Sequence, residues 1–374
     1  MLASSLLALP LLGLLPTPAS AASYTTLVKR HEGSTFFDGF NFFGHYDNTT
    51  NGDVVFVNQS ASADLAYVND AGNVIIKVDN TSVVPYNEKR NTVKITTQDT
   101  YGIGSLWVFD ATHVPYGCSV WPAFWSQAPE WPAGGEIDTF EGVNLQTTNQ
   151  YALHTTSGCT VAGTSANQSG NLTYSNCDSN ANGNSGCTVT EKNDASYGAA
   201  FAAAGGGVYA TELAETGVSI WFFSRADVPS DLLASNTSAV PDSSTWGTPS
   251  AYYPNSGCSI DEYFSAQHLT LDITLCGDWA GSASVFNATC SGVCYTDWVL
   301  NATNYDTAYF EIQSLRIYND GTNSSGNAGS SSSSSSNSSS GSSTPASSAV
   351  RLPTSTTSVV AGALFMALAW AVAL

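Results

Sequence analysis

Charged residues are scarce in this sequence, and basic residues are the scarcest of all. Only 11% of the 374 residues are Asp, Glu, Lys or Arg, against about 25% in ordinary soluble domains. Ten basic residues face 30 acidic ones, which gives a formal net charge of −20. Without a basic excess the chain cannot neutralise nucleic-acid phosphates, and its negative charge repels other polyanions. The composition therefore argues against nucleic-acid partners and polyanionic substrates.

An uncharged, apolar stretch opens the sequence. Residues 6–15 are apolar, broken only by Pro10 and Gly13, and Ala19-Ser20-Ala21 follows. An apolar core followed by small residues is typical of a secretory signal peptide, which would be removed after residue 21. A buried N-terminal helix is the alternative. We favour the signal peptide and therefore expect a secreted protein.

A second apolar stretch ends the sequence. Residues 359–374 are all apolar or small, and a short spacer separates them from Ala346-Ser347-Ser348. A small triplet, a spacer and a short apolar tail are typical of the signal for a glycosylphosphatidylinositol (GPI) anchor. A tail-anchored membrane span is the alternative, although the tail is shorter than the ~20 residues that a helical span needs. We expect a protein of the cell surface, on the plasma membrane or in the cell wall.

These signals divide the sequence into four parts. We expect a signal peptide at 1–21, a folded domain at 22–320, a serine-rich stalk at 321–348 and an anchor propeptide at 349–374. The stalk includes a serine run at 330–336 and has too few apolar residues to form a core, so we expect it to be disordered. We expect a monomer that contacts the membrane only through its anchor.

All cysteines lie inside the predicted domain. An even number in a secreted chain predicts disulfides throughout, although the spacing does not determine their pairing. Zinc binding is the alternative for the closely spaced pairs, but no histidine lies near them at ligand spacing. We therefore expect neither a metal nor another cofactor. The cysteines are at positions 118, 159, 177, 187, 258, 276, 290 and 294.

Apolar and polar residues alternate with a period of two in several stretches of the domain. Such alternation is typical of β-strands with one face toward a core. Phe310 and Ile312 have the opposite parity to Leu315 and Ile317, which predicts a bulge or bend between the pairs. The clearest strand candidates are 74–78, 217–223 and 269–275.

Helical periodicity is confined to residues 199–204, where three glycines follow. Many short strands separated by Gly-, Asn- and Ser-rich loops within one domain are typical of sandwiches. The sequence therefore predicts an all-β fold, a sandwich of two antiparallel sheets.

Three carboxylates lie close together in a chain where carboxylates are sparse: Glu136, Asp138 and Glu141. A strand places Glu136 and Asp138 on one face because they are two residues apart, whereas a helix would separate them. Glu141 would face the other way in a regular strand. One extra residue, Thr139 or Phe140, bulging out of the strand would bring all three carboxylates to one face.

A bulged strand would give this cluster a definite chemistry. The two glutamate carboxyl groups could approach to about 5–5.5 Å, the separation found in retaining glycosidases, where one carboxylate attacks the sugar directly. Close carboxyl groups do not all ionise freely, so one keeps a proton, as a general acid requires. A surface acidic cluster and a calcium site are the alternatives, but calcium favours more oxygen ligands in a loop.

The motif Glu136-Ile137-Asp138-x-x-Glu141 resembles the bulged, laminarinase-like signature of glycoside hydrolase family 16. The resemblance, to fungal endo-1,3(4)-β-glucanases of that family, extends over most of residues 24–318. It implies a β-jelly-roll with an open substrate cleft on its concave sheet. It also implies that Glu136 is the nucleophile, Glu141 the acid/base, and Asp138 a support for the nucleophile. The similar segments are Arg90–Val93, Tyr116–Cys118, Trp121–Trp125, Leu153–Thr155, Trp246–Pro249 and Cys276–Gly281.

Residues around the motif are candidates for substrate binding. Pyranose rings present apolar faces that stack on indoles, although tryptophan is also an ordinary core residue. We expect His154 to hydrogen-bond the carboxylates from a neighbouring strand, a satisfied core histidine being the alternative. Arg90 and Asn91 are candidates for contacts with distal sugars. The tryptophan candidates are Trp121, Trp125, Trp131 and Trp279.

Three functions remain open at this point. The first, which we predict, is retaining endo-hydrolysis of a neutral β-1,3-glucan or mixed β-1,3/1,4-glucan. The second is cell-wall transglycosylation through the same glycosyl-enzyme, which the predicted anchor favours. The third is a catalytically silent glucan-binding wall protein, against which the intact set of carboxylates argues.

Overall fold

The computed structural model describes residues 24–161, 167–233 and 239–321, all of which fall within one compact unit. The predicted signal peptide, the anchor propeptide and all of the stalk except Gly321 lie outside the described residues. In the described part of the chain, no helix is both long enough and apolar enough to cross a membrane.

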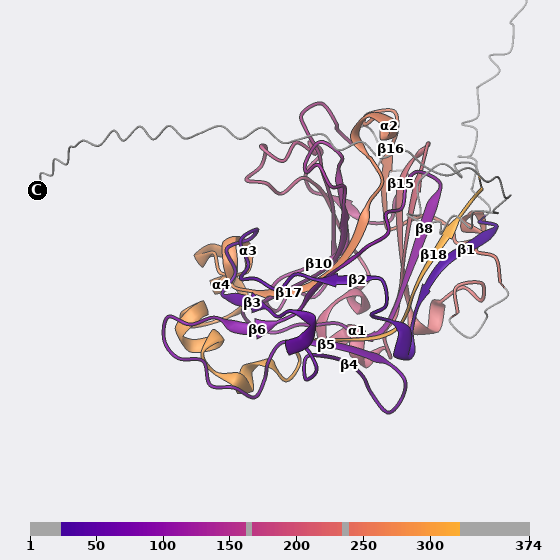
Figure 1. The fold of residues 1–374 in the computed structure, drawn as a ribbon. Helices are drawn as coiled ribbons and strands as arrows, with labels where there is room; N and C mark the ends of the chain where they lie inside the picture. The colour runs from indigo at the N-terminus through magenta and orange to yellow at the C-terminus, as the bar shows by residue number, and fades with distance from the viewer. Residues whose placement is uncertain (1–23, 162–166, 234–238, 322–374) are drawn as a thin grey trace, which may run out of the picture. The chain divides into compact units, whose positions relative to one another are not determined.

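Two eight-stranded antiparallel sheets form the fold (Figure 1). We call the sheet that contains the carboxylate motif the site sheet, and the other the back sheet. The site sheet has the order β12 (Asn171–Leu172), β13 (Cys187–Thr190), β11 (Gln150–His154), β10 (Glu136–Glu141), β9 (Val120–Gln127), β17 (His268–Leu275), β7 (Lys94–Thr97) and β2 (Phe40–Phe42).

The back sheet is built from the remaining long strands. Its order is β16 (Ala251–Pro254), β15 (Gly217–Ser224), β14 (Gly207–Ala214), β8 (Ser105–His113), β18 (Tyr309–Asn319), β5 (Val74–Lys77) and β4 (Ala66–Val68), and β1 (Thr26–His31) also pairs with β18. A small parallel pair, β3 (Val54–Phe56) and β6 (Arg90–Thr92), stands apart from both sheets. The predicted all-β sandwich is confirmed.

Short helices occur in the connections between strands. The predicted helix is α1 (Gly198–Ala203), but the expectation that helical structure is confined to that stretch is wrong. The missed helices have too few turns for their periodicity to stand out from the loops. They are α2 (Ile260–Tyr263), α3 (Gly277–Ala280) and α4 (Ala283–Thr289), with single turns at Gly33–Thr35, Gln59–Ala61, Asp194–Ser196, Arg225–Asp227, Ser243–Thr245, Cys294–Val299 and Ala302–Tyr305.

The predicted strands are present, and two of their details follow from packing. The parity change in β18 coincides with register shifts around Ile312, which confirms the predicted bulge. In β17, by contrast, the polar face is buried as well as the apolar one, since Thr270, Asp272 and Thr274 are all less than 9% exposed. Side chains of the neighbouring strands and loops hydrogen-bond all three residues: Thr96 to Thr270, Trp125 to Asp272 and Asp47 to Thr274.

Aromatic side chains from the two sheets meet in one core. Phe109 of β8 stacks on Phe124 of β9 with 4.6 Å between ring centroids. Phe140 of β10 packs against Tyr209 of β14 and Phe310 of β18. Because burying one such ring contributes on the order of 1.5–3 kcal/mol, this packing fixes which face of β10 turns toward the back sheet.

Every cysteine in the domain is paired. Two of the bonds, Cys118–Cys290 and Cys276–Cys294, hold α3, α4 and the turn that follows them beside the start of β9 and the end of β17. The other two are Cys159–Cys258 and the short-range Cys177–Cys187. Four disulfides are therefore confirmed, and the zinc alternative for these cysteines is excluded.

We predict that the native domain contains no titratable thiol and that reduction lowers its melting temperature strongly. Each disulfide in a secreted domain is typically worth about 2–5 kcal/mol. A thiol-specific reagent applied before and after denaturation, with thermal melts in the presence and absence of reductant, checks this. Two or more reactive thiols in undenatured protein would contradict the pairing.

Candidate active site

The carboxylate motif occupies the whole of β10, in the middle of the site sheet. Toward β9, Asp138 pairs with Trp125 and Phe140 pairs with Phe124, so Thr139 is the extra residue. The register toward β11 is shifted in the same place, between Asp138 and Glu141. The predicted bulge is therefore present, and it is centred on Thr139.

The bulge reverses the parity of β10. Glu136, Asp138 and Glu141 lie on the face turned away from the core, whereas Thr139 and Phe140 are fully buried. The Thr139 hydroxyl is satisfied on the core side, where it lies 2.7 Å from the Thr211 hydroxyl. All three carboxylates thus share one face of the site sheet.

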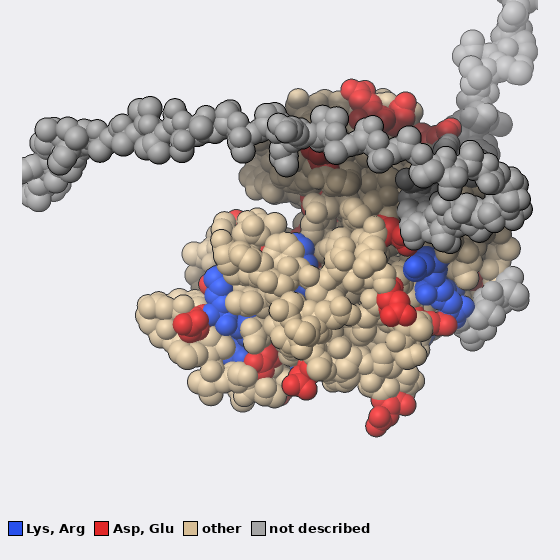
Figure 2. Space-filling model, viewed as in Figure 1, with Lys and Arg blue, Asp and Glu red and all other residues tan. Residues whose placement is uncertain are grey.

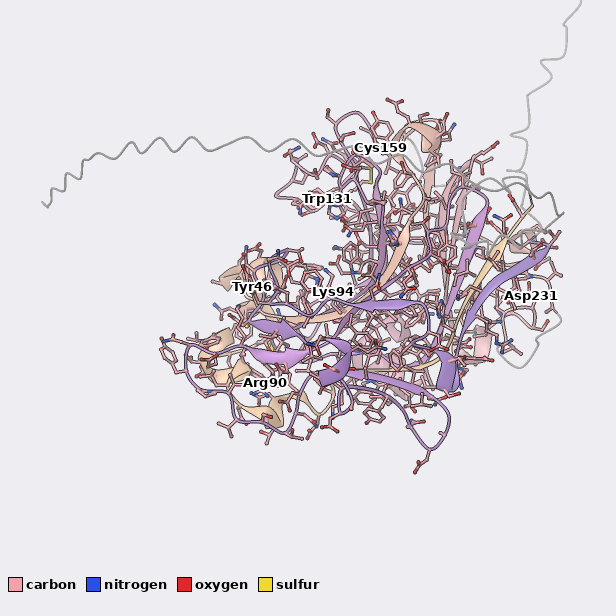
Figure 3. The ribbon with its side chains drawn as sticks, viewed as in Figure 1. Tyr46, Arg90, Lys94, Trp131, Cys159 and Asp231 are labelled. Atoms are coloured by element: carbon pink, nitrogen blue, oxygen red, sulfur yellow. A yellow bond between two sulfur atoms is a disulfide. The ribbon has the colours of Figure 1, made fainter. Side chains whose placement is uncertain are left out.

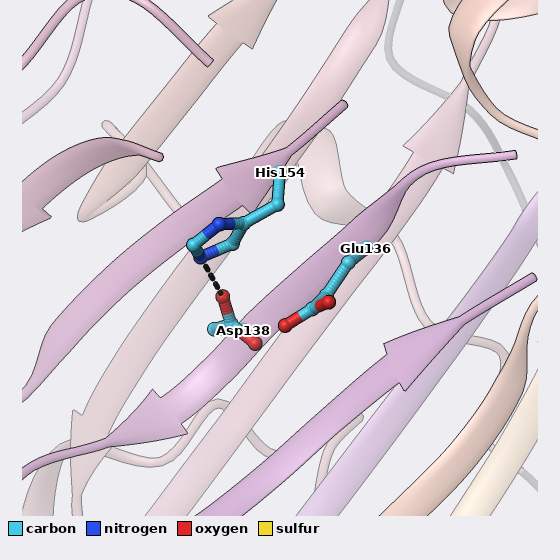
Figure 4. Close-up of side chains that lie close together, drawn as sticks. All are labelled: Glu136, Asp138 and His154. Carbon is cyan, nitrogen blue, oxygen red and sulfur yellow. Dashed lines mark ion pairs between the residues drawn. The ribbon is translucent and has the colours of Figure 1, made fainter. Parts of the chain in front are cut away.

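Indole and imidazole groups hold these carboxylates. Trp131 Nε1 donates to Glu136, and Trp121 Nε1 donates to Glu141 Oε1 at 2.8 Å. His154 lies opposite Glu136 on β11, and its Nε2 is 3.3 Å from Asp138 Oδ2 (Figure 4). Each carboxylate therefore has a nitrogen partner of its own.

The predicted tryptophans surround the same face. Trp125, directly opposite Asp138, donates through Nε1 to Asp272 Oδ1 at 3.0 Å. Trp279 packs edge-on against Trp121 with ring centroids 5.5 Å apart. Trp131 remains 45% exposed, which leaves much of its ring free to stack on a ligand.

A hollow opens beside these residues. Figure 2 shows it in the surface, and in Figure 3 Trp131 lies on one side of it and Tyr46 on the other. Lys94 lies at its inner end in Figure 3. Uncharged side chains cover most of this face of the molecule in Figure 2, a surface suited to a neutral ligand.

The carboxyl groups strongly affect one another's protonation. Burial raises the pKa of Glu136 and of Glu141 well above the ordinary value, and the charge of Asp138 raises both further. Burial alone would lower the pKa of His154, but its contact with Asp138 and the nearby glutamates outweigh this and raise it. Protonated His154 therefore offsets part of the negative charge, and the carboxyl cluster retains a proton at mildly acidic pH.

A metal ion is the other occupant that such a cluster could hold. Among the residues that the structure describes, Glu136, Asp138 and His154 form the one group whose ligand atoms lie close enough together, within 4.8 Å. However, Trp131 already donates to Glu136, and His154 already pairs with Asp138. The partners present therefore suit proton sharing better than metal binding.

One pair of predicted site residues lies elsewhere. Arg90 is fully buried, and its guanidinium donates to the carbonyls of Asp79, Ser82 and Val299. The prediction that Arg90 contacts a distal sugar is therefore corrected: the side chain ties loops together from inside the domain. Asn91 is exposed beside it on β6, away from the strands that carry the carboxylates.

Three residues of the site were not predicted from the sequence. Lys94 of β7 lies 4.0 Å from Asp272 of β17, and both are buried on the same face as the carboxylates. Asn149, just before β11, bonds to the backbone of the bulge. Asp272 had a visible signal, a charge on the polar side of an alternating strand, whereas Lys94 and Asn149 acquire their partners only through the fold.

Comparisons with known proteins agree with this geometry. Residues 40–318 match the XgeA-like, catalytic GH16 domain. A probable glycosidase of Schizosaccharomyces pombe is 39% identical over 304 residues, which cover 80% of this chain and 71% of that protein. The endo-1,3(4)-β-glucanase xgeA of Emericella nidulans is 40% identical over 319 residues, which cover 82% of this chain but 49% of that protein. The chain thus spans about half the length of that relative.

Solved structures show the same fold. The GH16 laminarinase of Phanerochaete chrysosporium, determined with β-glucans in its donor and acceptor sites, has a TM-score of 0.75 and 38% identity, covering 80% of this chain and 100% of that one. An elongating GH16 β-1,3-glucosyltransferase has a TM-score of 0.71 and 35% identity, covering 78% of this chain and 99% of that one. With the bulged carboxylate strand in place on a jelly-roll of two antiparallel sheets, the chain belongs to glycoside hydrolase family 16.

Proposed function

We propose that the domain cleaves internal bonds of a neutral β-1,3-glucan or mixed β-1,3/1,4-glucan and retains the β configuration. The observation that carries this proposal is the bulge at Thr139, which turns Glu136, Asp138 and Glu141 to one face of the site sheet. The family, and the glucan ligands of the related laminarinase, support the choice of substrate.

The reaction proceeds in two displacements. Glu136 attacks the anomeric carbon while Glu141 protonates the leaving glycosidic oxygen, which gives a covalent glycosyl-enzyme. Glu141 then takes a proton from water, and that water displaces Glu136 from the sugar. Each displacement inverts the anomeric carbon, so the product has the configuration of the substrate.

Protonation of the cluster suits these two roles. The raised pKa of Glu141 keeps its proton available for the leaving oxygen. Protonated His154 and the Trp131 N–H oppose the effects of burial and of Asp138 on the pKa of Glu136, which nevertheless stays raised. In our proposal Glu136 attacks in the state in which the proton of the cluster lies on Glu141. Asp138 lies between the two glutamates and, through its contact with His154, holds that positive charge beside the nucleophile.

Shape and charge of the cleft favour a neutral polymer. The exposed Trp131 ring provides an apolar platform for a pyranose. Figure 2 shows a hollow that is open at the surface, and we propose that a glucan chain lies along it across the carboxylates. The related endo-1,3(4)-β-glucanase xgeA supports internal cleavage as the proposed mode.

Transglycosylation is the second candidate, and one comparison favours it specifically. The elongating β-1,3-glucosyltransferase is nearly as similar to this chain as the laminarinase is. Both activities form the same glycosyl-enzyme and differ in whether water or a sugar accepts the glycosyl group. A silent glucan-binding protein is disfavoured because all three carboxylates are present and hydrogen-bonded or paired.

We further propose that the domain acts outside the cell and is attached to its surface by a GPI anchor. Four disulfides are typical of an oxidising compartment. The apolar segments at 6–15 and 359–374 support entry into the secretory route and replacement of the tail by a lipid.

The purified domain is expected to hydrolyse laminarin and mixed-linkage barley glucan but not the anionic carboxymethylcellulose. Proton NMR of the first products should show the β-anomer before mutarotation, and mass analysis should show internal fragments. An initial α-anomer would mean inversion and would overturn the paired-glutamate mechanism. Oligosaccharides longer than an added laminari-oligosaccharide would instead identify transglycosylation as the main activity.

Variants of the two glutamates serve as controls in the same assay. Glu136→Ser should abolish hydrolysis yet couple an α-glycosyl fluoride to an acceptor, because only the nucleophile is missing. Glu141→Ala should lose about 10²–10⁴-fold on laminarin, yet react with a substrate whose leaving group needs no proton. Added azide should then release a β-glycosyl azide.

His154→Gln is expected to move the pH optimum of kcat/KM toward alkaline pH. The positive charge of His154 lowers the pKa of both glutamates, so its removal raises both and shifts both limbs of the profile upward, by about one pH unit. His268→Gln is the matched control, because His268 lies on the same face two strands away from Glu136. An unchanged profile for His154→Gln, or equal shifts in both variants, would contradict this account.

Release by phosphatidylinositol-specific phospholipase C is the expected behaviour of the membrane-bound protein. A variant that ends at residue 348 should instead pass into the medium without lipase. Mass spectrometry of the released protein should find no peptide from residues 359–374. Recovery of a tail peptide that contains Phe365 from the mature protein would exclude the GPI anchor.

A further inference from the structure

The bulge in β10 leaves backbone groups that the sheet does not pair. Asp138 is in register with Ala152 of β11 and Glu141 with Gln150, so two ladder steps on β11 face three on β10. The peptide groups around Thr139 are buried with that residue. Buried N–H and C=O groups need partners, so something other than β11 must supply them here.

The side-chain amide of Asn149 supplies both partners. Its Oδ1 accepts from the Glu141 N–H at 2.9 Å, and its Nδ2 donates to the Thr139 carbonyl at 3.0 Å. A carboxamide offers one acceptor and one donor in one plane, as a peptide group does. Asn149 therefore takes the place of the missing ladder step, on the two residues that flank Phe140.

Asn149 is itself held rigidly. Its side chain is fully buried. Its backbone N–H donates to the Ser196 hydroxyl at 2.9 Å, and its carbonyl accepts from the Glu191 N–H at 2.9 Å. Through these bonds, Asn149 links the backbone of Glu141 to the segments that contain Ser196 and Glu191.

We propose that Asn149 is a positioning residue for the acid/base Glu141. The side-chain amide of Asn149 bonds to the backbone of the bulge, whereas the carboxyl group of Glu141 has its own partner in Trp121. By fixing the extra residue at Thr139, the amide fixes the parity of β10 and the distance of the Glu141 carboxyl from the leaving oxygen. The inference rests on the proposed function, because it assigns the effect to proton donation.

The test compares a substrate that needs the proton with one that does not. We expect Asn149→Ala to lower kcat/KM on laminarin about 10–100-fold, since an ångström of misplacement has such an effect on catalysis. On 2,4-dinitrophenyl β-laminaribioside, whose leaving group departs without protonation, the loss should stay within about threefold. A general folding defect would reduce the active fraction and so lower both values equally.

Gln168→Ala is the matched control. Gln168 is also buried, and its amide also joins two backbone segments, accepting from the Tyr252 N–H at 3.1 Å and donating to the Gly170 carbonyl at 3.4 Å. Its segments lie at the edge strands, away from β10. Any loss in this variant should therefore be the same for both substrates.

Asn149→Asp tests the same point if the alanine variant does not fold. A protonated aspartic acid can accept from Glu141 and donate to Thr139, whereas the ionised form can only accept. The ratio of the two kcat/KM values should therefore approach that of the wild type as the pH falls.

The outcomes separate this inference from the proposed function. In an active wild-type background, equal losses on both substrates for Asn149→Ala would overturn the positioning role alone. So would a ratio for Asn149→Asp that differs from the wild-type ratio by the same factor at every pH. A wild type that turns over neither substrate would overturn the proposed function and this inference together.

Discussion

One extra residue in β10 is the constraint on which the active site depends. In a regular strand, Phe140 would face the cleft and Glu141 the core. The extra residue, Thr139, exchanges them: it places Phe140 in the core against Tyr209 and Phe310 and at the same time turns Glu141 to the cleft face. The core therefore stabilises the active parity, because a slip that removed the bulge would place a carboxylate among aromatic rings.

The negative charge of the clustered carboxylates must be offset by nearby groups. In this site, the groups that offset it also suit a sugar ligand. The Trp121 and Trp131 N–H groups donate to Glu141 and Glu136 at the edge of each indole ring. The same rings present apolar faces of the kind that pack against a pyranose. His154 adds a positive charge from β11 through its contact with Asp138. Holding the carboxylates and shaping the binding surface are thus done by the same side chains.

The parts of this structure that follow from local pattern could be predicted from the sequence, and those that depend on distant partners could not. The strand face of Glu136 and Asp138, the bulge and the alternating strand β17 are encoded within a few neighbouring residues. Arg90 was assigned wrongly because its burial depends on carbonyls from loops near residues 80 and 299, which no local pattern reveals. Disulfide pairing and the Lys94–Asp272 contact are non-local in the same sense. Asn149 directly precedes β11, yet the role proposed for it exists only because a bulge on another strand leaves two peptide groups that it can bond.

Strand β9 forms the floor of the cleft, and its alternating side chains link the carboxylates of β10 to Asp272 of β17. On the cleft face of β9, Trp121, Ala123 and Trp125 alternate with core residues. Ala123 pairs with Glu141 on one side and with Asp272 on the other, so the smallest side chain of the three lies beside Glu141, the proposed acid/base. A bulky residue there would compete for space with the Glu141 carboxyl or with the Trp121 ring that donates to it. The bulge on β10 brings Glu141 to this row of the sheet, and the small residue on β9 leaves the space in which its carboxyl can meet a sugar.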